Sequence, residues 1–91
     1  MVGLTSREPC AQDVRVTEDE LEVWLTDGRR IAVPLVWYPR LLRASAGQRG
    51  NWQLLGNGEG IHWPDVDEDL SVEGLLRGSP SPEARRATTD R

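Results

Sequence analysis

Two runs in the first half of the chain place apolar residues at every second position. They are residues 21–25 (LEVWL) and 31–35 (IAVPL), and Asp27-Gly28 stands between them. An alternation of period two is typical of strands that bury one face, and Asp-Gly is a common hairpin turn. The pattern therefore predicts an antiparallel hairpin.

The register of this hairpin follows from its apolar residues. A three-residue loop at 26–28, with its glycine in the left-handed region, pairs Leu21 with Val33 and Val23 with Ile31. A two-residue loop would instead set Val23 opposite Ala32 and Leu25 opposite Arg30, and the apolar residues of the two strands would no longer be aligned. Because a slip of one residue turns a whole apolar set to solvent, we expect the three-residue loop.

Other elements are short and marked by Gly, Pro or capping residues. Pro34 lacks an N–H group, so its strand should lie at a sheet edge or leave the sheet there. Further strands are expected at 14–16, 52–55 and 61–63. Three helices are expected: 39–44 after Pro39, 46–51 after the capping box S-x-x-Q at 45–48, and 72–77 between Ser71 and Gly78.

Two details of this assignment depend on single segments. In the first helix, Leu41 and Leu42 should both face inward. The acidic run 65–69 is predicted to form a turn that leads into the charged start of the last helix, where carboxylates favour the positive end of the helix dipole.

These elements predict an α+β fold, a small antiparallel β meander of about three to five strands with two or three short helices. The chain has 91 residues, which is room for one domain. We expect a flexible N-terminus at 1–12, a single α+β domain at 13–78 and a disordered tail at 79–91, where Pro, Ser and charged residues replace any apolar period. So small a core would gain from a dimer or a bound partner.

Composition excludes several chemistries. All 11 cationic residues are Arg, and the absence of Lys excludes Schiff-base catalysis and a phosphate-binding P-loop. Cys10 is the single Cys and no run is apolar enough to cross a membrane, which together favour a reducing cytoplasm. His62 is the single His, so neither a zinc site nor a Ser-His-Asp triad is complete; it is expected to be half-buried beside an acid. We expect no enzyme activity and no cofactor.

Charge is unevenly distributed along the chain. Residues 28–58 contain five Arg and no acid, whereas residues 59–76 contain six acids and no Arg. If the fold keeps these segments apart, one face is positive and another negative; otherwise they pair internally. Candidate partner-binding residues are the aromatic and basic anchors Trp37, Tyr38 and Arg40, and the acids Asp65, Asp67, Glu68 and Asp69.

Two alternative functions use the same segments. The acids 65–69 could hold a metal ion, although Leu70 and Leu76 occupy the positions where an EF-hand loop needs Gly and Glu. The Arg-rich middle could contact nucleic acid, against the net charge of −4.

The segments LEVWLTDGRRIAVPLVWYPRL (21–41) and NWQLLGNGEGIHWPDVDEDLSVEGLLRG (51–78) resemble the bacterial domain-of-unknown-function 2442 family. The resemblance covers residues 14–78 and implies a small α+β fold with no established activity or catalytic residues. Some family members carry an appended helix-turn-helix, which the short tail here does not match. Others are encoded beside a small protein in an arrangement like a toxin–antitoxin pair. The resemblance thus implies an antitoxin-like or accessory protein-binding role, with a small partner protein.

Overall fold

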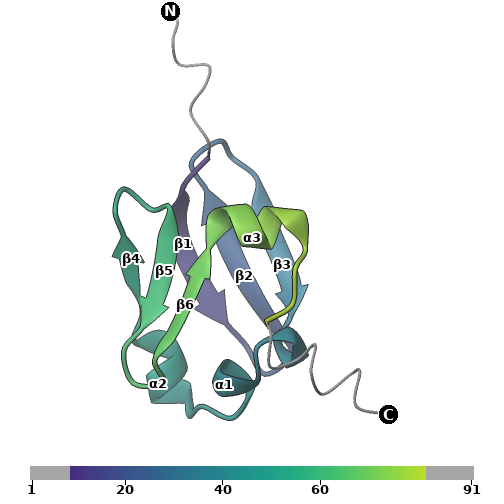
Figure 1. Ribbon diagram of the computed structural model, residues 1–91, viewed down its shortest axis with the longest axis vertical. Coiled ribbons are helices and arrows are strands. Elements are labelled where there is room, and N and C mark those ends of the chain that lie inside the picture. Colours follow the sequence, from purple (N-terminus) through teal and green to yellow (C-terminus); the bar gives the residue numbers. More distant parts are fainter. Residues whose placement is uncertain (1–8, 82–91) are drawn as a thin grey trace, which may run out of the picture.

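The computed structural model describes residues 9–81 and contains two three-stranded antiparallel sheets (Figure 1). The first sheet contains β1 (Ala11–Val16), β2 (Glu20–Leu25) and β3 (Arg30–Pro34), in that order. The second contains β4 (Gln53–Leu55), β5 (Gly60–Trp63) and β6 (Glu68–Ser71). Between the sheets along the chain come the 3₁₀ turn η2 (Leu35–Trp37), α1 (Pro39–Leu42) and α2 (Ala46–Gly50), and α3 (Val72–Arg77) follows β6. The predicted α+β fold is confirmed.

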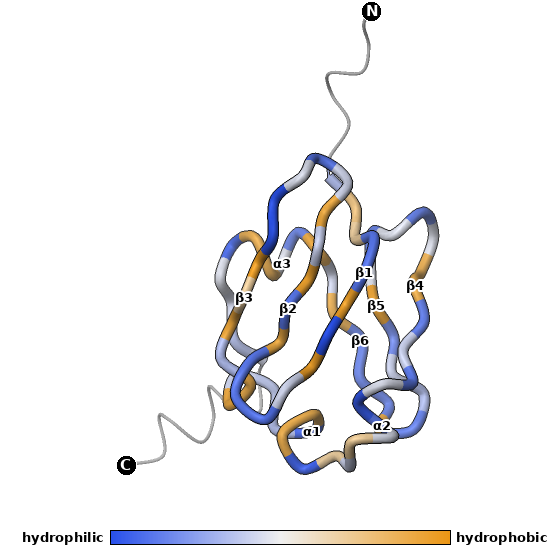
Figure 2. The backbone as a smooth tube through the Cα atoms, turned by 180° about the vertical axis from the view of Figure 1, so that it is seen from behind, coloured by the Kyte–Doolittle hydropathy of each residue, from blue (hydrophilic) through white to orange (hydrophobic). Residues whose placement is uncertain are grey.

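The second sheet and α3 enclose one face of the first sheet. In Figure 1, β4 and β5 lie beside β1, β6 and α3 lie in front of the first sheet, and α1 and α2 lie together at one end. Seen from behind, the first sheet turns its other face to the viewer, with hydrophilic and hydrophobic residues alternating along its strands and no described helix over it (Figure 2). The first sheet therefore buries only one face.

The predicted hairpin register is confirmed. Leu21 pairs with Val33 and Val23 with Ile31, and Gly28 has φ 96°. The three-residue loop closes where the N–H of Leu25 donates to the carbonyl of Arg29 at 2.8 Å. The apolar side chains of both strands therefore share the face that is turned to the core.

The end of β3 also follows the prediction. Pro34 is the last residue of an edge strand, and η2 begins at the next residue. A residue without an N–H group cannot continue a ladder on both sides, so the chain turns away from the sheet here.

The predicted caps are present at two helices. Ser45 and Gln48 form the reciprocal capping box of α2, and the Ser71 hydroxyl accepts from the N–H of Gly74 at 2.9 Å at the start of α3. Gly78 ends α3 in the left-handed conformation, with φ 78°.

The first helix is shorter than predicted, and one of its leucines was placed wrongly. α1 ends at Leu42; Leu41 is fully buried, but Leu42 is 39% exposed. Consecutive helical residues point about 100° apart, so a four-residue helix at the rim cannot bury both.

The prediction for the acidic run is wrong in part, because Glu68–Ser71 form the strand β6 and pair with β5. Alternation is present, but Glu68 occupies an inward position where an apolar residue is the usual signal. It stands opposite the buried Trp63, whereas Asp69 stands opposite His62 on the outer face. A buried carboxylate thus concealed the period of two.

The boundaries of the domain are wider than predicted. β1 begins at Ala11, within the stretch expected to be flexible, and the N–H of Ala11 donates to the carbonyl of Gly58 at 2.6 Å. At the other end, the N–H of Ser81 donates to the carbonyl of Trp37 at 3.1 Å, so residues 79–81 are part of the folded domain. The remaining residues of the predicted N-terminal and C-terminal segments, 1–8 and 82–91, lie outside the described residues.

The core is shared by both sheets and all the helical segments except α2. Its largest fully buried side chains are Trp63 and Tyr38, and they pack with leucines and valines of β2, η2, α1 and α3. Within residues 9–81, the structure has no helix of the length and apolarity that crossing a membrane requires.

Because β1 approaches the β4–β5 turn closely, we predict that Gly58 cannot be replaced by a residue with a Cβ without loss of stability. Gly58 has φ 98°, and a Cβ there would overlap the Ala11 carbonyl oxygen; Gly28 has φ 96° but open space around it. We expect Gly28→Ala to lower the free energy of unfolding by about 1–2 kcal/mol, from backbone strain alone. Gly58→Ala should lose at least about 1 kcal/mol more, because the clash adds to the strain.

Urea unfolding curves of both variants measure this difference. Gly47→Ala is the matched control, because Gly47 lies in α2 with open space around it, and it should be neutral or stabilising by up to about 1 kcal/mol. Equal losses in Gly58→Ala and Gly28→Ala would contradict the close packing of Ala11 on Gly58.

Candidate functional site

The two segments singled out by sequence meet at the end of the domain where α1 and α2 lie. The Nη1 atom of Arg40 donates to the backbone carbonyl of Asp67 at 2.6 Å. The side-chain amide of Asn51 donates to Asp65 Oδ2 at 3.0 Å. Asp67 itself has φ 54°, an uncommon conformation for a residue other than glycine. The β5–β6 turn is therefore fixed to the helical segment by a basic side chain, and the charges interleave here.

The four acids of the run do not form one cluster. Asp65 and Asp67 lie exposed in the turn, Glu68 is only 8% exposed, and Asp69 is on the outer face of the second sheet. Asp69 Oδ1 bonds with Nδ1 of His62, so the expectation of a half-buried histidine beside an acid is confirmed. Nowhere in residues 9–81 do three or more His, Cys, Asp or Glu side chains gather as a metal site would require.

The Arg-rich middle is likewise divided. Arg29 pairs with Asp27 at 2.8 Å and Arg30 with Glu22 at 2.8 Å, both near the turn between β2 and β3. That turn lies at the opposite end of the molecule from α1 and α2, the segment that contains the other three arginines (Figure 1). The five arginines therefore do not gather into one basic surface.

Arg49 has a structural role that sequence reasoning missed. Its guanidinium donates to the carbonyls of Leu41 at 3.0 Å and Leu42 at 2.8 Å, which caps the end of α1. Its own carbonyl accepts from the indole N–H of Trp63 at 3.0 Å. One residue thus connects both helices to the buried Trp63.

The two predicted aromatic anchors differ in exposure. Tyr38 is 2% exposed, and Trp37 is half-buried against the core. Trp37 is the last residue of η2 and Tyr38 links η2 to α1, so their burial follows from the turn that brings the chain from β3 to the core. The Tyr38 ring is therefore not a surface anchor, whereas the Trp37 ring keeps part of its surface exposed.

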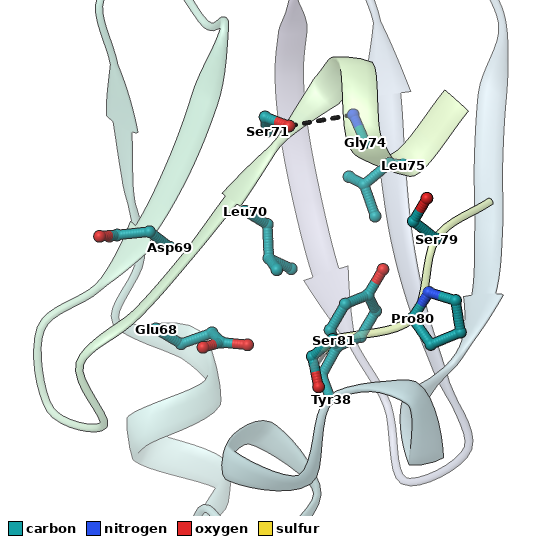
Figure 3. Close-up of a pocket in the computed structure, with 10 residues that line it drawn as sticks. All are labelled: Tyr38, Glu68, Asp69, Leu70, Ser71, Gly74, Leu75, Ser79, Pro80 and Ser81. Carbon is teal, nitrogen blue, oxygen red and sulfur yellow. Dashed lines mark hydrogen bonds between the residues drawn. The ribbon is translucent and has the colours of Figure 1, made fainter. Parts of the chain in front are cut away.

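Tyr38 instead lines a pocket of about 210 Å³ between β6, α3 and residues 79–81. Glu68 and Leu70 line it from β6, Leu75 from α3, and Pro80 from the segment after α3 (Figure 3). The Glu68 carboxylate is turned toward the pocket, whereas Asp69 points away from it (Figure 3). Tyr38 and Glu68 were both predicted from the sequence as candidate site residues, but only the fold places them in the same pocket.

The electrostatics of this pocket are dominated by the phenol and the carboxylate. Burial, and secondarily the negative charge of Glu68, raises the pKa of Tyr38 to about 12. The phenol therefore keeps its proton at neutral pH and can both donate and accept a hydrogen bond.

A second surface was not anticipated from the sequence. β4 is an edge strand whose three residues are all exposed, and Leu54 and Leu55 are 37% and 43% exposed. In residues 9–81, no strand pairs with its outer edge. Leu54 and Leu55 are adjacent in the segment 52–55 (WQLL), so they cannot lie on the same face of a strand. This pattern could have predicted a strand with apolar residues on both faces.

Comparison with known proteins identifies the family. A protein-family model described as "Protein of unknown function (DUF2442)" matches residues 11–81 of the chain. The chain belongs to the DUF2442 family. No curated protein matches the chain.

Two solved structures are similar to this DUF2442 chain. A crystal structure of a protein of unknown function from Rhodospirillum rubrum ATCC 11170 shares 34% identity and a TM-score of 0.73, over 86% of this chain and 96% of that chain. A solution NMR structure of an uncharacterised protein from Chromobacterium violaceum has 20% identity and a TM-score of 0.70, over 88% of this chain and 75% of that chain. The second likeness is one of fold alone.

The raised pKa of Tyr38 predicts how the DUF2442 chain responds to alkali. Tyr38 is the only Tyr, so phenolate absorbance reports on it alone. The native protein should titrate near 12 and the denatured chain near the ordinary value of 10.0. Because the folded pKa is the higher one, stability is intact below about pH 10 and falls as the pH rises toward 12.

Glu68→Gln should lower the native midpoint, because it removes the charge that opposes the phenolate. Between about pH 10 and pH 12, the free energy of unfolding should fall less in Tyr38→Phe than in the wild type. A native midpoint near 10 would contradict the burial of Tyr38 beside Glu68.

The bond from Arg40 to Asp67 predicts a difference between two neighbouring arginines. Arg40→Met removes the donor to the turn carbonyl and should cost about 1–2 kcal/mol of unfolding free energy. Arg43→Met is the matched control, because Arg43 is exposed and forms no ion pair among residues 9–81, and it should change stability by less than about 0.5 kcal/mol. Chemical unfolding measures both, and equal effects would show that the turn does not depend on Arg40.

Proposed function

We propose that this chain is a non-enzymatic, cytoplasmic protein-binding module that takes an extended segment of a small partner protein along β4. This is the kind of role that the antitoxin half of a toxin–antitoxin pair has, in which binding covers the partner's working surface. The observation that carries the proposal is the exposed edge of β4 with its two exposed leucines.

An edge strand of this kind is suited to strand addition. Soluble proteins usually blunt such edges with Lys, Pro, bulges or a covering element. Residues 53–55 (QLL) include no charge and no Pro. A partner strand would satisfy the outward N–H and C=O groups of β4, and the leucines on the two faces would give side-chain contacts.

The side chains of β4 are placed for such contacts. Leu54 stands opposite Ile61, on the inner face of the second sheet, but at the rim of the core it stays partly exposed. Leu55 lies over Gly60 on the other face, with its Cδ1 3.4 Å from where a Cβ of Gly60 would be. An added strand could therefore extend the core at Leu54 and cover Leu55.

Charge favours a basic partner over a second copy. The net charge of −4 opposes self-association and attracts a cationic protein. Nucleic-acid binding is less well supported, because Arg29 and Arg30 are paired with acids and Arg49 binds backbone carbonyls. The dispersal of the acidic run gives no support to metal binding.

The proposal is tested by capture of the partner with matched variants. The tagged full chain should recover one small protein in stoichiometric amount from the native host. Leu54→Lys should lower that recovery at least about tenfold, equivalent to about 1.4 kcal/mol, because a charge on an edge strand opposes strand addition. Val36→Lys is the control, since Val36 is 60% exposed and lies on η2, away from β4 in sequence. It should leave the recovery unchanged.

Three results would overturn the proposal. They are the recovery of no partner, equal recovery by Leu54→Lys and the wild type, and a self-associated species in sedimentation that Leu54→Lys abolishes. The last would show that the edge of β4 pairs with a second copy of the chain.

A further inference from the structure

The second sheet is the acid-rich part of the domain. Residues 50–76, which contain β4, β5 and β6, include six acids and no Lys or Arg. The arginines that flank this segment are engaged elsewhere. Arg49 binds the carbonyls at the end of α1, and Arg77 pairs with Glu73 at 3.2 Å. A chain that pairs with β4 therefore approaches a negatively charged part of the surface.

Several of these acids are not available to a partner at β4. Asp69 Oδ1 bonds with Nδ1 of His62, and the guanidinium of Arg40 lies at the backbone carbonyl of Asp67. Glu68 is buried. The charge that a partner meets at β4 must therefore come from the acids that are left.

Two exposed carboxylates remain in the two turns at opposite ends of β4 (Figure 1). Glu59 lies in the β4–β5 turn, with its Oε1 3.4 Å from where a Cβ of Gly56, the residue after β4, would be. Asp65 lies in the β5–β6 turn, and its Oδ2 accepts from the side-chain amide of Asn51 at 3.0 Å, two residues before β4. Neither carboxylate forms an ion pair within residues 9–81. The edge is thus neutral along β4 and negative near both ends.

The middle of the edge is apolar. Leu54 stands opposite Ile61 at the rim of the core, and it is 37% exposed. An apolar side chain beside Leu54 would bury surface that is now exposed. The step from Asn51 to Gly56 is five residues, or about 17 Å of extended chain. Long cationic side chains on a neighbouring strand can reach carboxylates at both ends of such a span while their stems cover apolar surface.

We infer that the segment bound along β4 is an extended basic peptide, with an apolar residue beside Leu54 and an Arg or Lys on each side of it. This inference rests on the proposed strand addition and names the chemistry of the partner. Strand pairing supplies most of the affinity. Glu59 and Asp65 select a basic segment over a neutral or acidic one, because charges at the rim of an interface act mainly on specificity and association rate.

The test uses the full chain and three heptapeptides with acetylated and amidated ends: RTVTVTR, QTVTVTQ and ETVTVTE. They share one centre and differ only in the charge of their end residues. In amide NMR titrations at about 20 mM salt, the basic peptide should shift residues 53–55 saturably and bind at least about tenfold more tightly than the acidic one. The neutral peptide should lie between them. Salt at about 0.5 M should remove most of the difference, because it screens exposed charges.

Matched variants locate the source of the preference. Glu59→Gln combined with Asp65→Asn removes both carboxylates at nearly constant shape and should weaken binding of the basic peptide about fivefold. Glu18→Gln combined with Asp19→Asn is the control, because it changes the net charge equally in the exposed turn between β1 and β2. It should weaken that binding by less than about twofold.

The outcomes separate this inference from the proposed function. Equal affinity for the three peptides, with shifts at residues 53–55, would overturn the inference and leave strand addition at β4 in place. Equal effects of the two double variants would show that Glu59 and Asp65 do not select the partner, and would also overturn it. Saturable shifts confined to other elements, or none with any peptide, would overturn it as well, and the capture experiment with Leu54→Lys then decides the proposed function by itself.

Discussion

The rest of the structure depends on the burial of Trp63 at the centre of a small core. Its ring is fully buried, and its N–H donates to the Arg49 carbonyl, while the Arg49 side chain binds the carbonyls at the end of α1. An aromatic ring of this size contributes about 3–5 kcal/mol to a core, a large share of the 5–15 kcal/mol typical of a whole domain. One side chain therefore holds the second sheet, α1 and α2 in a single arrangement.

This small core decides what is left at its periphery. There is enough apolar material to cover one face of the first sheet and the strands β5 and β6, but β4 lies beyond it, with all three residues exposed. On the other side of β5 lies β6, where Glu68 occupies the inward position opposite Trp63. A pocket lined by Glu68 and Tyr38 remains there. The exposed strand β4 and the pocket beside Tyr38 are thus two places where the core ends.

The sequence predicts the individual strands and helices well, but it predicts the tertiary contacts between them poorly. The β2–β3 register followed from alternation and one glycine, and the helix caps followed from Ser45, Gln48 and Ser71, because these signals act within a few residues. β6 was missed because its inward residue is the carboxylate of Glu68. The pocket could not be predicted, since it joins Tyr38 to residues far along the chain.

The candidate site shows the same limit. The segments containing Arg40 and Asp67 were both chosen from sequence, and the structure brings them together, but through a backbone carbonyl that no sequence pattern marks. The exposed edge of β4 depends on the order of strands in a sheet, which is a property of the fold.

The central claim is that β4 is the edge along which a partner strand binds. Hydrogen–deuterium exchange on the free chain and on its captured complex tests it most directly. We predict that the outward-pointing amides within residues 53–55 become strongly protected in the complex, because their N–H groups gain hydrogen bonds to the partner strand. The amides of α3 should change little. Protection confined to α3, the first sheet or the pocket, with β4 exchanging as in the free chain, would contradict the claim.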